Sequence, residues 1–184
     1  MQSFCLGENY GEKTMLDDKQ LNQIREAGFK AEKNERGCAQ CVLLAVKDTY
    51  DVPPEIFKAA SGLSGGIALT GEGPCGAFIG GAMLIGHMWG RNLDNLGDKR
   101  SMRTAAEHVR KFKEYFDAEY GSFHCADVQR KIMGQGGFKL YLPDEYARFE
   151  SLGGHDDKCT NVVANAAMWL AKTIDEIQAL EPKA

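Results

Sequence analysis

Apolar residues recur every three or four positions along most of this chain, which is the spacing of amphipathic α-helices. One long segment carries five such residues on a single face: Met102, Ala106, Val109, Phe112 and Phe116. The segment from about Lys158 to Leu180 shows the same spacing. The pattern therefore predicts a chain that is almost wholly helical.

Glycine and proline divide this pattern into elements. Gly37 ends a first helix that begins near Asp17, because glycine is favoured just after a helix. Pro53–Pro54 stop a second helix, which begins at Cys38, and open a short third one.

The second half of the chain is divided in the same way. A Gly-rich loop, residues 62–74, precedes a helix of small residues, 75–90. Residues 134–154 are the least regular part, and the FKLYL segment within them is a candidate for a brief strand. Without repeats or linkers, we predict an all-α fold, a compact single-domain bundle of five or six helices over residues 1–184.

Charge and hydropathy narrow the class of protein. The 184 residues include 22 basic and 26 acidic side chains, a net charge of −4, which disfavours a nucleic-acid-binding protein. The longest apolar stretch, Cys75–Gly90, has 16 residues and contains His87, which is short of the ~18 that a membrane span needs. No basic segment followed by an apolar one opens the chain, so we expect no signal peptide and a cytoplasmic location.

Six cysteines are the main chemical feature: Cys5, Cys38, Cys41, Cys75, Cys125 and Cys159. Cytosolic thiols stay reduced, so a framework of structural disulfides is disfavoured. A free cysteine is more often a small buried apolar residue than a functional one. Evidence for chemistry must therefore come from where the cysteines lie.

Four of the six fall at the expected starts of helices. Cys38 follows Gly37 and Cys75 follows Pro74, whereas Ser122 and Asp157 are expected N-caps just before the other two, Cys125 and Cys159. The first turn of a helix has unpaired N–H groups and a partial positive charge. Both stabilise a thiolate and lower its pKa, and both favour the sulfurs of an iron–sulfur cluster. We therefore expect these four cysteines to meet in one site.

Glycines near Cys75 suggest how such a site is built. Ten of the 21 glycines lie between Gly62 and Gly90. The loop before Cys75 can wrap a ligand without Cβ clashes, so Gly73 and Gly76 are predicted to bind the cofactor. Glycines spaced four apart, as in Gly76–Gly80 and Gly86–Gly90, predict that another helix packs closely.

Three other motifs carry less weight. Residues 71–76 fit G-x-G-x-x-G, but no βαβ pattern surrounds them, so dinucleotide binding is disfavoured. Cys38-x-x-Cys41 has the spacing of redox and zinc motifs without the context of either. His124 and His155 are candidate ligands or proton donors, although we interpret them first as solvated loop residues.

The cysteine pattern resembles that of a redox-active protein family named for its C-GCAxxG-C-C motif. The similarity covers about residues 30–175, and its most specific string is CGAFIG at 75–80 after the SGLSGG loop. It maps the four shared cysteines onto the four at helix starts. A related helical module is fused to haem domains in some anaerobe cytochromes, where an iron–sulfur centre has been proposed. The resemblance implies redox work without a defined reaction.

This chain departs from the family pattern in three places. Cys41 stands where the family usually has a small residue, one helical turn from Cys38. Residues 134–154 form a longer segment than usual. Cys5 lies outside the pattern, and we interpret it as incidental.

The leading hypothesis is a cytoplasmic electron-transfer protein with a [4Fe–4S] or [2Fe–2S] cluster. Its expected ligands are the four cysteines at helix starts, with Cys41 as a spare or exchangeable ligand: Cys38, Cys75, Cys125, Cys159 and Cys41. Its partner would be another redox protein, and a homodimer is possible. Two alternatives stay open: a metal-free thiol–disulfide protein and a structural zinc site in an interaction module.

Overall fold

The computed structural model describes residues 15–181, and eight α-helices lie within them. They are α1 (Asp18–Asn34), α2 (Cys38–Val46), α3 (Pro54–Ala59), α4 (Gly76–Trp89), α5 (Lys99–Tyr120), α6 (Cys125–Met133), α7 (Pro143–Ser151) and α8 (Cys159–Leu180). A 3-10 turn, Ala60–Leu63, follows α3, and a π-helical turn, Gly154–Lys158, precedes α8. The predicted all-α class is confirmed.

The predicted number of helices, five or six, is too low. The segment 134–154, expected to be irregular, contains α7, which begins with Pro143 and carries Asp144 and Glu145 in its first turn. Proline in the first turn and acidic residues near the N-terminus both favour a helix start. FKLYL is not a strand, since the only β-pairing within residues 15–181 is an isolated bridge between Pro74 and His124.

Side-chain caps account for where two of the long helices, α1 and α5, begin. The Asp17 side chain accepts a hydrogen bond from Gln20 N–H, and Gln20 Oε1 accepts one from Asp17 N–H, which forms a capping box at α1. Asp98 caps α5 by accepting from Ser101 N–H at 2.9 Å. The apolar face of α5 is buried only from its middle onward, because Met102 is 45% exposed whereas Phe112 and Phe116 are fully buried.

Two close approaches between helices set the arrangement of the bundle. α1 packs on α8, where a Cβ on Gly28 would lie 3.1 Å from Ala164 Cα. α2 packs on α4, where a Cβ on Gly80 would come closer than 3.0 Å to Ala39 O. The predicted close approach is therefore right at Gly80, but Gly86 has nothing within 4 Å of its Cβ position.

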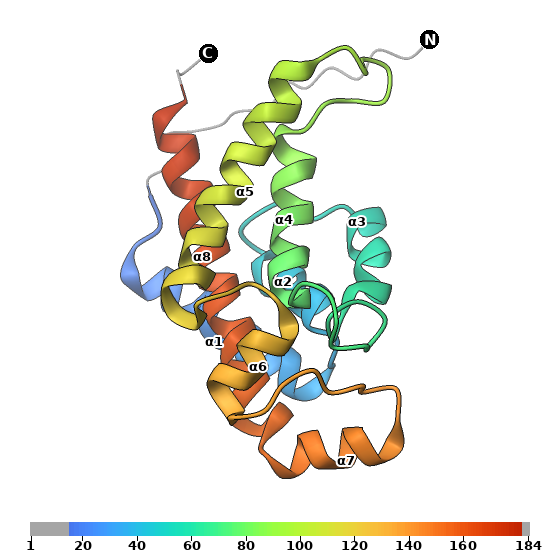
Figure 1. Ribbon diagram of the computed structural model, residues 1–184. Coiled ribbons are helices and arrows are strands. Elements are labelled where there is room, and N and C mark those ends of the chain that lie inside the picture. Colours follow the sequence, from blue (N-terminus) through green and yellow to red (C-terminus); the bar gives the residue numbers. More distant parts are fainter. Residues whose placement is uncertain (1–14, 182–184) are drawn as a thin grey trace.

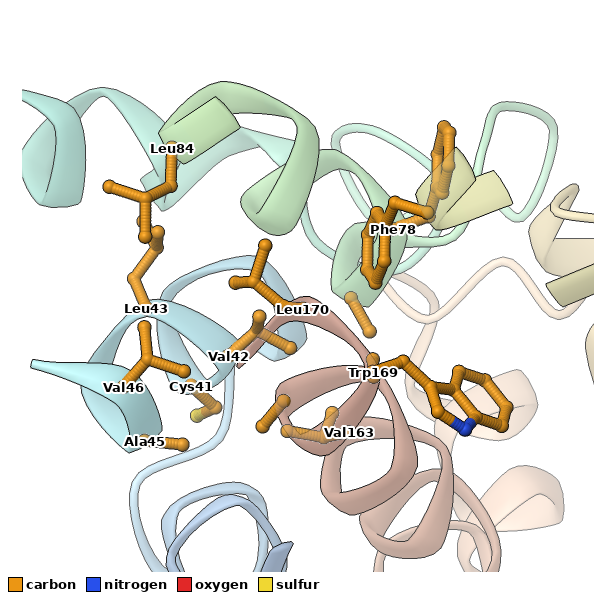
Figure 2. Close-up of a cluster of buried hydrophobic side chains, with 14 of the residues drawn as sticks. Cys41, Val42, Leu43, Ala45, Val46, Phe78, Leu84, Val163, Trp169 and Leu170 are labelled. Carbon is orange, nitrogen blue, oxygen red and sulfur yellow. The ribbon is translucent and has the colours of Figure 1, made fainter. Parts of the chain in front are cut away.

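The core lies between α2, α4, α5 and α8. The Phe78 ring stacks on Phe112 at 5.6 Å between centroids, and Phe116 packs edge-on against Trp169 at 5.5 Å. Figure 2 shows Phe78 and Trp169 beside the aliphatic side chains that α2 and α8 contribute. This core holds α2, α4 and α8 in place, and cysteines lie at the starts of these three helices.

In Figure 1, α8 rises from the lower part of the view, where α6 and α7 also lie, whereas α4 begins near mid-height beside α2. Within residues 15–181, no helix is both long and apolar enough to cross a membrane.

Candidate functional site

Four cysteines stand at the starts of four helices, as predicted. Cys38, Cys125 and Cys159 are the first residues of α2, α6 and α8, and Cys75 directly precedes the first residue of α4. The expected caps are wrong in detail, because His124 and Lys158, rather than Ser122 and Asp157, occupy the N-cap positions. Ser122 instead donates a hydrogen bond to the Asp127 carboxylate, at 2.9 Å.

These four cysteines line one cavity of about 190 Å³. Its other walls are largely apolar and come from distant parts of the chain: Leu69, Val128, Leu140, Phe149, Val162 and Val163. All five cysteines in residues 15–181 are free thiols. The fold thus brings together four thiols that are up to 121 residues apart in sequence (159 − 38).

Two of the four cysteines are held to each other through their backbones. Cys75 N–H donates to Phe123 O at 2.8 Å, and Cys125 N–H donates to Gly73 O at 3.0 Å. The isolated bridge between Pro74 and His124 lies between these bonds. The starts of α4 and α6 therefore form one unit that presents both thiols to the cavity.

The glycines near the cysteines allow close approach. A Cβ on Gly76 would come closer than 3.0 Å to Cys38 Sγ, and a Cβ on Gly66 would lie 2.9 Å from Cys125 Cβ. At Gly73, the crowding atom is Gly66 O, 2.9 Å from the Cβ position. Neither Gly73 nor Gly76 is among the residues that line the cavity, so their contact with a cofactor stays a prediction.

A left-handed stretch of backbone covers the cavity. Five consecutive residues, 65–69, have positive φ, and three of them are not glycine: Ile67, Ala68 and Leu69. Left-handed conformations cost L-residues roughly 1–2 kcal/mol each, so the surroundings must hold this segment in place. Leu69 O accepts a hydrogen bond from Leu140 N–H at 2.8 Å, which ties the stretch to the segment before α7. Gly65 and Leu69 themselves line the cavity.

The expectation that the cavity thiols have lowered pKa values is wrong. Burial raises the pKa of Cys75 and that of Cys125 to about 12, with a smaller contribution from neighbouring thiols. Burial also raises the pKa of Cys38 and of Cys159 well above the ordinary value of a thiol. Hydrogen bonds from the backbone of Ala77 and Phe78 lower the pKa of Cys75, but this effect is smaller than the desolvation. At neutral pH the thiols are protonated unless a bound cation displaces the protons.

Cys41 does not line the cavity. Its side chain is 1% exposed, and its thiol donates to Arg36 O at 3.1 Å. Figure 2 shows Cys41 among apolar core side chains of α2 and α8. The structure thus places the Cys41 thiol in the hydrophobic core and not at the cavity.

Among the residues that line the cavity, the buried acid Glu32 was not identified from the sequence. Glu32 is 2% exposed, and burial raises its pKa to about 7, although the Cys41 thiol and Arg36 act in the opposite direction. A signal was present, because Glu32 lies four residues after Gly28, on the face of α1 that packs against α8.

His155 was a candidate ligand or proton donor from the sequence, and its interpretation first as a solvated loop residue is wrong. It lies in the π-helical turn before α8, is 9% exposed and lines the cavity. Its Nδ1 hydrogen-bonds to Glu150 Oε1, and its Nε2 lies 3.6 Å from Glu32 Oε1. Burial lowers the pKa of His155, with the Glu150 carboxylate acting against this. His124 is exposed as expected, with its ring 4.6 Å from that of Phe123.

A comparison with protein families matches residues 37–173 to a family described as "Putative redox-active protein (C_GCAxxG_C_C)". The chain belongs to this family. The match spans the four cavity cysteines of this C_GCAxxG_C_C protein and begins after Glu32. Comparisons with curated proteins and with solved structures found no match.

The cavity of the C_GCAxxG_C_C protein can be tested against the metal groups that thiols bind. Within residues 15–181, no group of three or more His, Cys, Asp or Glu side chains is arranged so that it could hold a metal ion. A zinc site needs four ligands at about 2.0–2.3 Å from one point. A cluster spreads its ligands over several metal atoms, so its cysteines surround a volume rather than a point. The four cysteines line one cavity without converging on a single point among the described residues.

Proposed function

We propose that this protein carries electrons by means of an iron–sulfur cluster, [4Fe–4S] or [2Fe–2S], held in the cavity by Cys38, Cys75, Cys125 and Cys159. The observation that carries the proposal is that four thiols from four helix starts line a single cavity. Membership of a family described as redox-active supports it. When bound, the cluster would supply a one-electron redox couple.

The residues around the cavity suit such a group. Most of the cavity wall is apolar, and the backbone N–H groups near Cys75 and Cys38 can donate to anionic sulfur. Ser64, whose hydroxyl hydrogen-bonds to Cys38, adds a further donor. These donors stabilise negative charge that burial alone would penalise.

Metal-free thiol–disulfide exchange remains the alternative, and the free thiols at one cavity favour it. Exchange requires an accessible thiolate. Burial raises the pKa of all four cavity thiols, which keeps them protonated at neutral pH. The cluster is therefore the better-supported function, since metal coordination can displace the protons.

We infer that the electron partner is another redox protein and that the site of action is the cytoplasm. The description of the family as redox-active supports a redox partner. A homodimer is compatible with this role, and sedimentation of the loaded protein would measure the oligomeric state.

Purification and reconstitution without oxygen test the cluster directly. We expect a brown protein with sulfur-to-iron charge-transfer absorption and with iron and acid-labile sulfide in equal amounts. Substitution of Cys75 or Cys125 by serine should abolish the colour. Colourless wild-type protein with all thiols free after reconstitution would overturn the cluster and favour thiol exchange.

A further inference from the structure

Glu32 is a buried acid in the wall of the cysteine cavity, and one of its carboxylate oxygens has no hydrogen-bond partner among residues 15–181. Its side chain is 3% exposed. Its Oε2 atom is buried and has no hydrogen-bond partner among residues 15–181. A buried carboxylate oxygen without a partner is costly, by roughly 1–3 kcal/mol or more for a charged group.

The other oxygen of Glu32 is already engaged. Its Oε1 lies 3.6 Å from His155 Nε2, and His155 is fixed in turn by its hydrogen bond to Glu150. This chain of contacts orients the carboxylate without satisfying Oε2. The arrangement is that of a ligand held in place by its neighbours.

The position of Glu32 along the cavity is set by α1. Glu32 lies in the last turn of this helix and lines the same cavity as the four cysteines. It also lies before residue 37, where the family match begins.

We propose that Glu32 supplies a carboxylate oxygen as a further ligand to the metal group of this cavity. This inference rests on the proposed cluster. Carboxylate is a harder ligand than thiolate and suits a more oxidised or more loosely held metal atom. One iron of the cluster would then differ from the others in coordination, and its oxygen ligand could be exchanged for an external one.

A purely structural role makes a different prediction. If Glu32 served only as the partner of His155, its replacement would alter stability and leave every iron in an all-sulfur environment. Glu32→Gln keeps the shape of the side chain and removes the charge. Glu35→Gln is the matched control, because Glu35 is exposed at the C-terminal end of the same helix.

The experiment is Mössbauer spectroscopy of wild-type protein, Glu32→Gln and Glu35→Gln, each reconstituted anaerobically with ⁵⁷Fe and assayed for iron and sulfide per chain. We expect wild type and Glu35→Gln to show one iron subsite with a higher isomer shift than the rest, and Glu32→Gln to lose that subsite.

Each other result is decisive. A subsite that persists unchanged in Glu32→Gln, or a wild-type spectrum in which all irons have thiolate-type parameters, overturns the role of Glu32 and leaves the cluster standing. Wild-type protein that takes up no iron overturns both proposals. If Glu32→Gln does not fold, the wild-type spectrum alone still decides between the two roles of Glu32.

Discussion

At the scale of single residues, burial and helix position act on the cavity thiols in opposite directions. Each thiol lies where a helix start would lower its pKa. Each is also removed from water, which penalises the thiolate, and this second effect is larger. The metal-free protein is therefore folded around protonated thiols, and its stability depends on pH.

The free energy of unfolding of the metal-free protein should fall as pH rises above about 8.5, the ordinary pKa of an unfolded thiol. Below that pH the thiols are protonated in both the folded and the unfolded state, so their titration does not lower the free energy of unfolding. Above it the unfolded chain loses protons that folded Cys75 and Cys125 keep until about pH 12. Each such thiol contributes a loss of up to about 1.4 kcal/mol per pH unit.

Urea unfolding between pH 7 and 10, in a reducing and metal-free buffer, measures this loss. The doubly substituted Cys75→Ser/Cys125→Ser protein is the control and should show a shallower decline. Equal slopes for the two proteins would contradict the raised thiol pKa values.

Cys38 and Cys41 should respond differently to substitution. Cys38 lines the cavity, so Cys38→Ser should abolish cluster uptake or the thiol chemistry of the site. Cys41 lies in the core and bonds Arg36 O, so Cys41→Ala should retain the cluster and lose about 1–2 kcal/mol of stability. Iron content and thermal unfolding of the two variants provide the measurement. A Cys38→Ser protein with unchanged iron content and thiol reactivity would show that the assignment is wrong.

At the scale of the elements, α4 is the helix whose small residues decide how the site is assembled. Gly76 leaves room for the sulfur of Cys38, and Gly80 leaves room for the backbone of α2 one turn later. Both contacts bring α2 against α4 at the end where the cavity lies. Gly86, two turns further along, has no such neighbour.

Two alanine substitutions in α4 should therefore change the free energy of unfolding in opposite directions. Gly80→Ala places a Cβ against Ala39 O, which belongs to backbone and cannot turn away, so we expect a loss of about 3 kcal/mol and weaker cluster binding. Gly86→Ala meets open space within the helix and should gain about 0.5–1 kcal/mol. Denaturant unfolding of both variants tests this, and a stable Gly80→Ala protein would refute the close packing of α2 on α4.

At the scale of the whole molecule, the sequence predicted what local signals determine. The helix class and the helix starts at Cys38 and Cys75 followed from spacing, glycine and proline, whereas those at Cys125 and Cys159 were predicted from Ser122 and Asp157, which are not the N-caps. The thiol pKa values did not follow, because they depend on burial created by segments far away in the chain. Glu32 and the burial of His155 were missed for the same reason, since α1, α7 and the π-helical turn become the cavity wall only after packing. The division into domains and the ligand roles stay predictions.

The packing of α1 on α8 has a consequence for biosynthesis. Arg25 of α1 donates hydrogen bonds at 3.1 Å to Asn161 and Asn165 of α8, just after Cys159. A ribosome synthesises Cys38 long before it reaches these residues. The cavity is therefore complete only when the first turns of α8 have emerged and docked on α1. The proposed cluster would therefore find all four of its cysteine ligands only after Cys159 has been translated.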